Sequence, residues 1–188
     1  SEFMREMGIW SRKTPNYLLL KLFEEYAGLK SDYILTGTEY MVRKLKELGA
    51  TGRLIRAPSS VDHQAYDFNL KYRNKIRNNL GINKRKVILY LGKFGGLYYD
   101  KEIAKFCSIL YEVDPDYFFL IVTPSNINKI SDLFRESGLN NQDFFITEAH
   151  GQKDVIKFIC SADMGLTAIP PTPSQKYRSP LKVAEYLM

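Results

Sequence analysis

The sequence predicts an α/β protein built on a parallel sheet with helices on both faces. Short hydrophobic runs of the kind that form buried strands alternate along the chain with segments whose hydrophobic residues recur at helical spacing. The connections between them are short, and from about residue 85 onward four strand–helix units follow one another without a break. This order is typical of a doubly wound parallel sheet.

The first part of the chain, residues 4–57, carries the end of one such sheet. Thr14-Pro15 is a helix-start signal followed by leucines at helical spacing, and a short strand is expected at 33–35. A second helix is expected from Thr38 to Gly49, and a second strand at 54–55. These elements are too few to bury a core of their own. We therefore expect residues 4–57 to be a fragment of a first domain, and residues 1–3 to be an expression scar outside the fold.

Residues 58–84 are expected to be an interdomain linker, because polar residues dominate them. The stretch includes a mostly charged helix over 72–80, which Gly81 is expected to cap.

The main domain is expected to span residues 85–188. Its strands are predicted at 87–91, 117–122, 144–146 and 164–169, and the first two are continuous apolar runs, as in central parallel strands. Ser125 is a candidate cap for the helix that ends at Gly138. The last helix runs to the final residue without a capping glycine, so the sheet is expected to be truncated.

Composition excludes several classes of protein. The 188 residues are 45% hydrophobic and 26% charged, which is ordinary for a globular protein. The net charge of +6 is compatible with a nucleotide or an anionic membrane surface as partner, but acidic residues are interspersed nearly everywhere. A lysine-rich solvated surface explains the charge equally simply. No recognisable nucleic-acid-binding module is present, so nucleic acid is not expected as a partner.

Cysteine and histidine usage argues against metal or redox chemistry. Cys107 and Cys160 stand among apolar neighbours, as buried reduced thiols do, and no C-x-x-C pair occurs. With only His63 and His150 available, no metal site is expected. No apolar run approaches the ~20 residues of a membrane span. In the absence of a secretory signal we expect a cytoplasmic protein.

Three loops are expected to meet at the carboxyl edge of the main sheet, where open α/β sheets bind phosphate-bearing ligands. They are residues 93–99, 148–152 and 172–182. The candidate binding residues on these loops are Lys93, Gly95, Gly96, His150 and Lys182, and Glu185 lies in the helix that follows the third loop. Glycine amides and lysines suit a phosphate, and a carboxylate suits sugar hydroxyls. The alternatives are a tight turn for the glycines, an incidental loop histidine, and a surface ion pair between Lys182 and Glu185.

The last of these loops leads into a specific pattern. Residues 179–187 (Ser-Pro-Leu-Lys-Val-Ala-Glu-Tyr-Leu) resemble the S-P-x-K-x-x-E-Y-L segment of group 1, family-4-type glycosyltransferases. Residues 161–166 are similar to their aD-x-G-L strand, 89–96 to the opening of their C-terminal domain, and 60–62 to the G-V-D at their interdomain junction. The resemblance covers roughly residues 30–188.

This resemblance implies a GT-B architecture of two Rossmann-like domains, with 85–188 as an incomplete donor-binding domain. It implies a retaining enzyme of the hexosyltransferase type that moves a sugar from a nucleotide-diphosphate donor without a metal or other cofactor. Its acceptor would be a glycan or a lipid-linked glycan in surface polysaccharide synthesis. The expected location is then cytoplasmic, with peripheral contact at the inner face of the membrane.

The resemblance also assigns roles to the candidate residues. Glu185 would bind the ribose, and the segment around His150 would contact the base. Lys182, Lys93 and the amides of Gly95 and Gly96 would face the diphosphate. No catalytic base or nucleophile is predicted.

Two departures from the family pattern bear on these roles. Tyr177 stands where the family's first paired glutamate falls, and Tyr98, flanked by Leu97 and Tyr99, stands where a basic residue is usual. A chain of this extent is not expected to transfer a sugar by itself. The alternative is a non-catalytic α/β module that binds a nucleotide or a partner. A dinucleotide oxidoreductase is disfavoured, because the first strand of the main domain lacks G-x-G-x-x-G.

Overall fold

The computed structural model describes residues 2–96 and 98–187, so Ser1, Leu97 and Met188 lie outside the described residues. The chain divides into two compact units, each considered by itself. The first holds the residues up to Ser60 together with Pro170–Leu181, and the second holds Val61–Ile169 and the residues from Lys182 on.

The first unit contains a two-stranded parallel sheet. Strands β1 (Tyr33–Thr36) and β2 (Arg53–Arg56) pair in register, with Tyr33 opposite Arg53. The helical elements of this unit are α1 (Glu2–Glu6), α2 (Pro15–Lys30), α3 (Glu39–Glu47) and the 3-10 helix η1 (Gln175–Tyr177). The predicted helix starts are confirmed: Pro15 is the first residue of α2, and the Thr38 side chain caps α3 by accepting a hydrogen bond from the Met41 amide.

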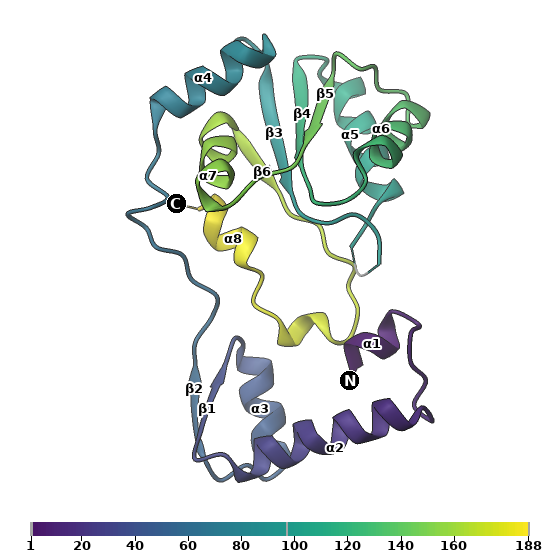
Figure 1. Cartoon of the computed structure of the whole chain (residues 1–188), viewed down its shortest axis with the longest axis vertical. Coiled ribbons are helices and arrows are strands. Elements are labelled where there is room, and N and C mark those ends of the chain that lie inside the picture. The colour runs from purple at the N-terminus through teal and green to yellow at the C-terminus, as the bar shows by residue number, and fades with distance from the viewer. Residues whose placement is uncertain (1, 97, 188) are drawn as a thin grey trace. The chain divides into compact units, whose positions relative to one another are not determined.

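The second unit is built on a four-stranded, entirely parallel sheet with the strand order β5-β4-β3-β6 (Figure 1). The strands are β3 (Lys86–Leu91), β4 (Tyr117–Val122), β5 (Phe144–Thr147) and β6 (Met164–Leu166). The helices are α4 (Leu70–Leu80), α5 (Lys101–Val113), α6 (Ile127–Glu136), α7 (Gln152–Ser161) and α8 (Leu181–Tyr186), whose first residue belongs to the first unit.

Alternate residues of each central strand face opposite layers of helices. Ile88 and Tyr90 of β3 pack in the cluster that contains α5 and α6, whereas Val87, Leu89 and Leu91 pack in the cluster that contains α7. A strand buried on both faces must be apolar throughout, which is why the sequence shows continuous runs here. The predicted class, a parallel α/β sheet with helices on both faces, is confirmed.

The segment after residue 60 packs closely on the second unit. Tyr66 is buried with Ile156 and Cys160, and α4 lies against α7. Gly81 caps α4 in the left-handed conformation, with φ of 69°, as predicted. The predicted boundaries at 57/58 and 84/85 remain a prediction, but residues 61–84 form part of the second compact unit.

Two local expectations are wrong. Ser125 does not cap α6: Asn126 does, by accepting a hydrogen bond from the Lys129 amide. The last strand of the sheet is also shorter than predicted, because β6 pairs with β3 over only three residues, Met164–Leu166, before the proline-rich segment.

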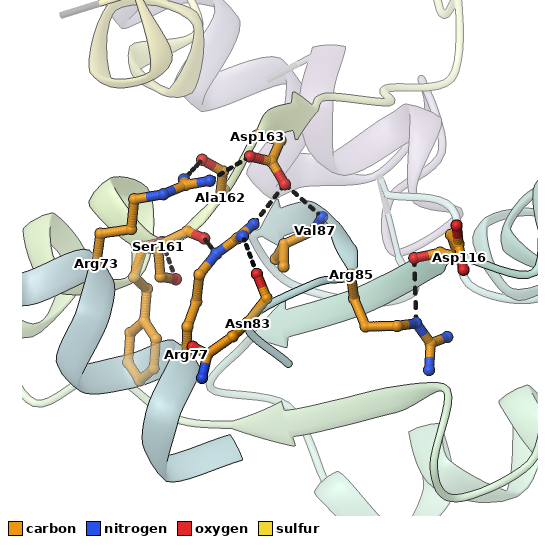
Figure 2. Close-up of polar contacts among 10 residues, drawn as sticks. Arg73, Arg77, Asn83, Arg85, Val87, Asp116, Ser161, Ala162 and Asp163 are labelled. Atoms are coloured by element: carbon orange, nitrogen blue, oxygen red, sulfur yellow. Dashed lines mark hydrogen bonds and ion pairs between the residues drawn. The ribbon is translucent and has the colours of Figure 1, made fainter. Parts of the chain in front are cut away.

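A polar clamp joins α4 to the amino ends of β3 and β6. Figure 2 shows Arg73 and Arg77 reaching from α4 to the two carboxylate oxygens of Asp163. Asp163 Oδ2 also accepts the Val87 amide at 2.8 Å, and Arg77 Nε donates to the Ser161 carbonyl at 2.9 Å. Burial raises the pKa of Asp163, but the hydrogen bonds from Arg73 and Val87 and the two arginine charges outweigh it, so the pKa is lower than usual. The clamp fixes where β6 starts beside β3.

Both cysteines are buried, as predicted. Burial raises the pKa of the Cys107 thiol to about 12, so this side chain is an inert part of the core beneath α5.

Candidate functional site

Helix α8 is held to the sheet by the ring and hydroxyl of Tyr186. The ring covers Gly165 of β6 so closely that a Cβ there would lie 2.5 Å from Tyr186 Cγ. The hydroxyl accepts the Leu91 amide at 2.9 Å and donates to the Leu166 carbonyl at 3.3 Å, so it bridges the carboxyl ends of β3 and β6. This anchor brings the neighbouring Glu185 to the edge of the sheet that the sequence predicts for a ligand.

Glu185 is a carboxylate with only 4% of its surface exposed. Its Oε1 accepts a hydrogen bond of 2.9 Å from the hydroxyl of Tyr66, a residue 119 positions earlier in the chain. Its Oε2 lies 2.8 Å from the Lys182 ammonium, which forms an ion pair with it. Apart from this ion pair, Oε2 has no hydrogen-bond donor among the described residues.

The predicted pairing of Lys182 with Glu185 is therefore present, but it differs from a solvated surface pair. The Lys182 side chain is 36% exposed, whereas that of Glu185 is 5% exposed. A buried carboxylate is retained at a cost in desolvation unless its oxygens are well partnered. Buried polar atoms without a hydrogen-bond partner are rare, so Oε2 makes Glu185 a candidate for a functional role.

Tyr66 is the neighbour of Glu185 that sequence reasoning missed. Burial raises the pKa of Tyr66 to about 12, and the hydrogen bond to Glu185 contributes to the increase. Gln152, the first residue of α7, has the opposite effect on this pKa.

The loop after β3 forms a tight turn, which was the alternative to a phosphate-binding role for its glycines. The Tyr90 hydroxyl donates to the Lys93 carbonyl at 2.8 Å, and the Phe94 amide donates to Ser125 Oγ at 3.1 Å. Gly95 and Gly96 have φ of 76° and 68°, a conformation that other residues rarely adopt. Ser125 thus holds this loop rather than capping α6.

The predicted phosphate-facing groups on this loop differ from one another in exposure and in hydrogen bonding. Lys93 and Gly96 are exposed. The Gly95 amide donates to the Tyr99 carbonyl at 3.5 Å, a long and weak bond that a stronger acceptor could replace. Tyr98, the residue at the departure from the family pattern, closes the turn by donating its amide to the Gly95 carbonyl.

His150 follows β5, which is separated from β3 by β4, so it lies on the same sheet edge as Lys93 but two strands away. Its side chain is exposed, and its amide donates to Asp154 Oδ2 at 3.3 Å. The structure thus gives His150 an accessible ring but no direct tie to Glu185.

The third predicted loop belongs largely to the first unit. There the Tyr177 ring lies 4.9 Å from the Lys44 ammonium and 5.1 Å from that of Lys176. Ser179, the first residue of the family-like pattern, accepts two hydrogen bonds from Ser59, one from its amide and one from its hydroxyl. Tyr177 therefore has a structural cation–π role in this unit, in place of the glutamate expected from the family pattern.

Across residues 2–96 and 98–187, His, Cys, Asp and Glu do not gather in a group of three or more that could hold a metal ion. Within the same residues, we find no helix of sufficient length and apolar character to cross a membrane.

Comparison with known proteins identifies the fold. No protein-family model and no curated protein matches the sequence. Among solved structures, WaaG, a glycosyltransferase involved in lipopolysaccharide biosynthesis, matches with a TM-score of 0.70 and 15% identity over 94% of this chain and 48% of that chain. Anabaena Alr3699/HepE in complex with UDP and glucose matches with a TM-score of 0.64 and 14% identity, over 85% of this chain and 45% of that one.

Sucrose-phosphate synthase from Thermosynechococcus elongatus matches with a TM-score of 0.61 and 15% identity, over 82% of this chain and 38% of that chain. The likeness in fold to group 1 glycosyltransferases of the GT-B type, predicted from residues 179–187, is confirmed. At these identities the likeness shows the fold alone. This chain spans less than half the length of each of these three structures.

Proposed function

We infer that the second unit is the nucleotide-sugar-binding part of a glycosyltransferase, and that Glu185 binds the ribose of the donor. The observation that carries this inference is the buried Glu185 carboxylate, whose Oε2 has no hydrogen-bond donor among the described residues. A ribose hydroxyl is a donor of the right kind, and a bond to a buried carboxylate is strong. The fold supports it, because Alr3699/HepE has been crystallised with UDP-glucose.

Lys182 would pair first with Glu185 and then with the diphosphate of the bound donor. Without a ligand its ammonium covers Oε2 of Glu185. A bound diphosphate would attract the ammonium, and the movement would leave Oε2 open to the ribose.

The remaining charge on the diphosphate would be met by Lys93 and by the amides of Gly95 and Gly96. Groups held ready for a departing diphosphate lower the barrier to sugar transfer by electrostatic stabilisation. The resemblance suggests transfer without a metal and with retention of configuration. It also suggests a glycan or lipid-linked acceptor in surface polysaccharide synthesis, with the enzyme in the cytoplasm at the inner face of the membrane. His150 would contact the base.

A second candidate, a module that binds a nucleotide without transferring a sugar, is favoured by one observation. Tyr177 occupies the place of the family's first paired glutamate, and its ring is engaged by Lys44 and Lys176. This candidate predicts nucleotide binding without hydrolysis or transfer of the sugar.

Substitution of Glu185 tests the ribose role. We expect Glu185→Ala to weaken binding of the preferred nucleotide by about 1–3 kcal/mol, the worth of a hydrogen bond to a charged group. This corresponds to roughly a 5- to 150-fold increase in Kd, measurable by isothermal titration calorimetry. Glu136→Ala, which removes an exposed carboxylate from α6, is the matched control and should leave Kd unchanged.

Glu185→Gln separates binding from folding, because its amide oxygen can still accept from Tyr66. It should fold as the parent chain does, by circular dichroism, yet bind the nucleotide more weakly. Equal Kd values for the parent, Glu185→Ala and Glu185→Gln would contradict the ribose role.

A further inference from the structure

The neighbour that most restricts Glu185 is Tyr66. Its ring is 5% exposed and packs with Ile156 and Cys160, so the hydroxyl cannot turn away without disturbing that cluster. A tyrosine hydroxyl has one proton to donate, and here the acceptor is Oε1 of Glu185 at 2.9 Å.

The direction of this hydrogen bond is fixed by the chemistry of its two groups. An ionised carboxylate only accepts hydrogen bonds, whereas a phenol hydroxyl has a proton to donate. The tyrosine proton is therefore directed to Glu185. With a pKa of about 12, Tyr66 remains a donor over the whole physiological range.

The two oxygens of Glu185 are thus unequal. Oε1 already accepts a hydrogen bond from a tyrosine whose ring is held in a buried cluster, whereas Oε2 has only the ion pair with Lys182, on a flexible side chain that is 36% exposed. A carboxylate with both oxygens open can bind two adjacent hydroxyls of a ribose together. Here Tyr66 already donates to Oε1, so Oε2 is the oxygen that becomes available once the Lys182 ammonium moves away.

We propose that Tyr66 is a specificity-determining residue that restricts Glu185 to a single hydroxyl of the ribose. This role rests on the proposed function of Glu185. With Tyr66 in place, only one of the two ribose hydroxyls contributes to the affinity for the nucleotide. Tyr66 acts through Glu185, so it is a positioning residue.

The test compares a nucleoside diphosphate with its 2′-deoxy and 3′-deoxy forms, by calorimetry. For the parent chain we expect one deoxy form to bind within about twofold of the complete nucleotide, and the other to bind at least ~10-fold more weakly, because only one hydroxyl meets a carboxylate. In Tyr66→Phe, Oε1 becomes open to the second hydroxyl. Both deoxy forms should then bind at least ~5-fold more weakly than the complete nucleotide.

Tyr72→Phe is the matched control, because it removes a hydroxyl beside the same cluster and keeps the Tyr66–Glu185 bond. It should preserve the parental pattern. Equal losses for both deoxy forms in the parent chain, or an unchanged pattern in a folded Tyr66→Phe, would overturn the role of Tyr66 alone. Binding of no nucleotide by the parent chain would instead overturn the proposed function, and the role of Tyr66 with it.

Discussion

Replacement of Gly165 by alanine is expected to lower the free energy of unfolding by about 3 kcal/mol, the upper range for overpacking a well-filled core. The new Cβ would lie 2.5 Å from Tyr186 Cγ and 2.6 Å from its Cδ2, and a flat, hydrogen-bonded ring cannot deform. Either β6 or α8 must shift. Urea unfolding monitored by circular dichroism measures the loss.

A double substitution separates the steric cause from the backbone. Gly165 does not have a positive φ, so an alanine is compatible with its backbone. In a Tyr186→Ala background, Gly165→Ala should therefore change the free energy of unfolding by less than about 1 kcal/mol. A loss of about 3 kcal/mol in both backgrounds would show that the ring is not the cause.

Asp163→Ala is expected to lower the free energy of unfolding by a similar amount, about 3 kcal/mol. The substitution leaves Arg77, which is 7% exposed, without its carboxylate, and leaves the Val87 amide without an acceptor. The estimate is at the low end for a buried ion pair because the Asp163 side chain is 34% exposed. Chemical denaturation at pH 7 is the measurement.

The contribution of Asp163 should also depend on pH. Its pKa is lower in the folded chain than the ordinary 3.8, so the carboxylate stabilises the fold at pH values above 3.8. This stabilisation should disappear as the pH falls through the lower pKa of the folded state. The difference between parent and Asp163→Ala should shrink accordingly in acid.

Asp132→Ala supplies the control for this prediction. Asp132 pairs with Arg135 at 2.9 Å, but both side chains are more than half exposed. Its loss should cost at most about 0.5 kcal/mol. An Asp163→Ala variant as stable as Asp132→Ala would contradict the structural role of the clamp.

Much of the fold follows from local sequence patterns. The strands β3 and β4 are continuous apolar runs because both of their faces are covered by helices. The caps at Thr38 and Gly81 were predictable because each depends on one residue and its nearest neighbours. The contact between Lys182 and Glu185 follows from helical spacing in the same way.

The remaining features depend on packing between distant segments. Ser125 and Asn126 are equally good caps by residue type, and the choice is made by the Phe94 amide, which engages Ser125. The Tyr66 contact with Glu185 spans 119 positions, and neither side chain shows a local signal of the other. The place of Tyr186 over Gly165 likewise required the structure, although Tyr186 belongs to the pattern that suggested the family.

The sequence predicted which residues belong to the candidate site better than it predicted how they are arranged. The sequence placed Lys182 and Glu185 together, and the structure adds that the carboxylate is buried and shared with Tyr66. The hydrogen bond from the Gly95 amide to the Tyr99 carbonyl could not be predicted, because it depends on the geometry of the loop. The roles of Lys93, Gly95, Gly96 and His150 toward a nucleotide remain predictions.

The most direct test of the nucleotide-sugar assignment is calorimetric titration of the unmodified chain with UDP, GDP, ADP and CMP. The chain is first shown to be folded by circular dichroism. We expect saturable binding of one of these nucleotides at a single site. A folded chain that binds none of the four would contradict the nucleotide-sugar assignment.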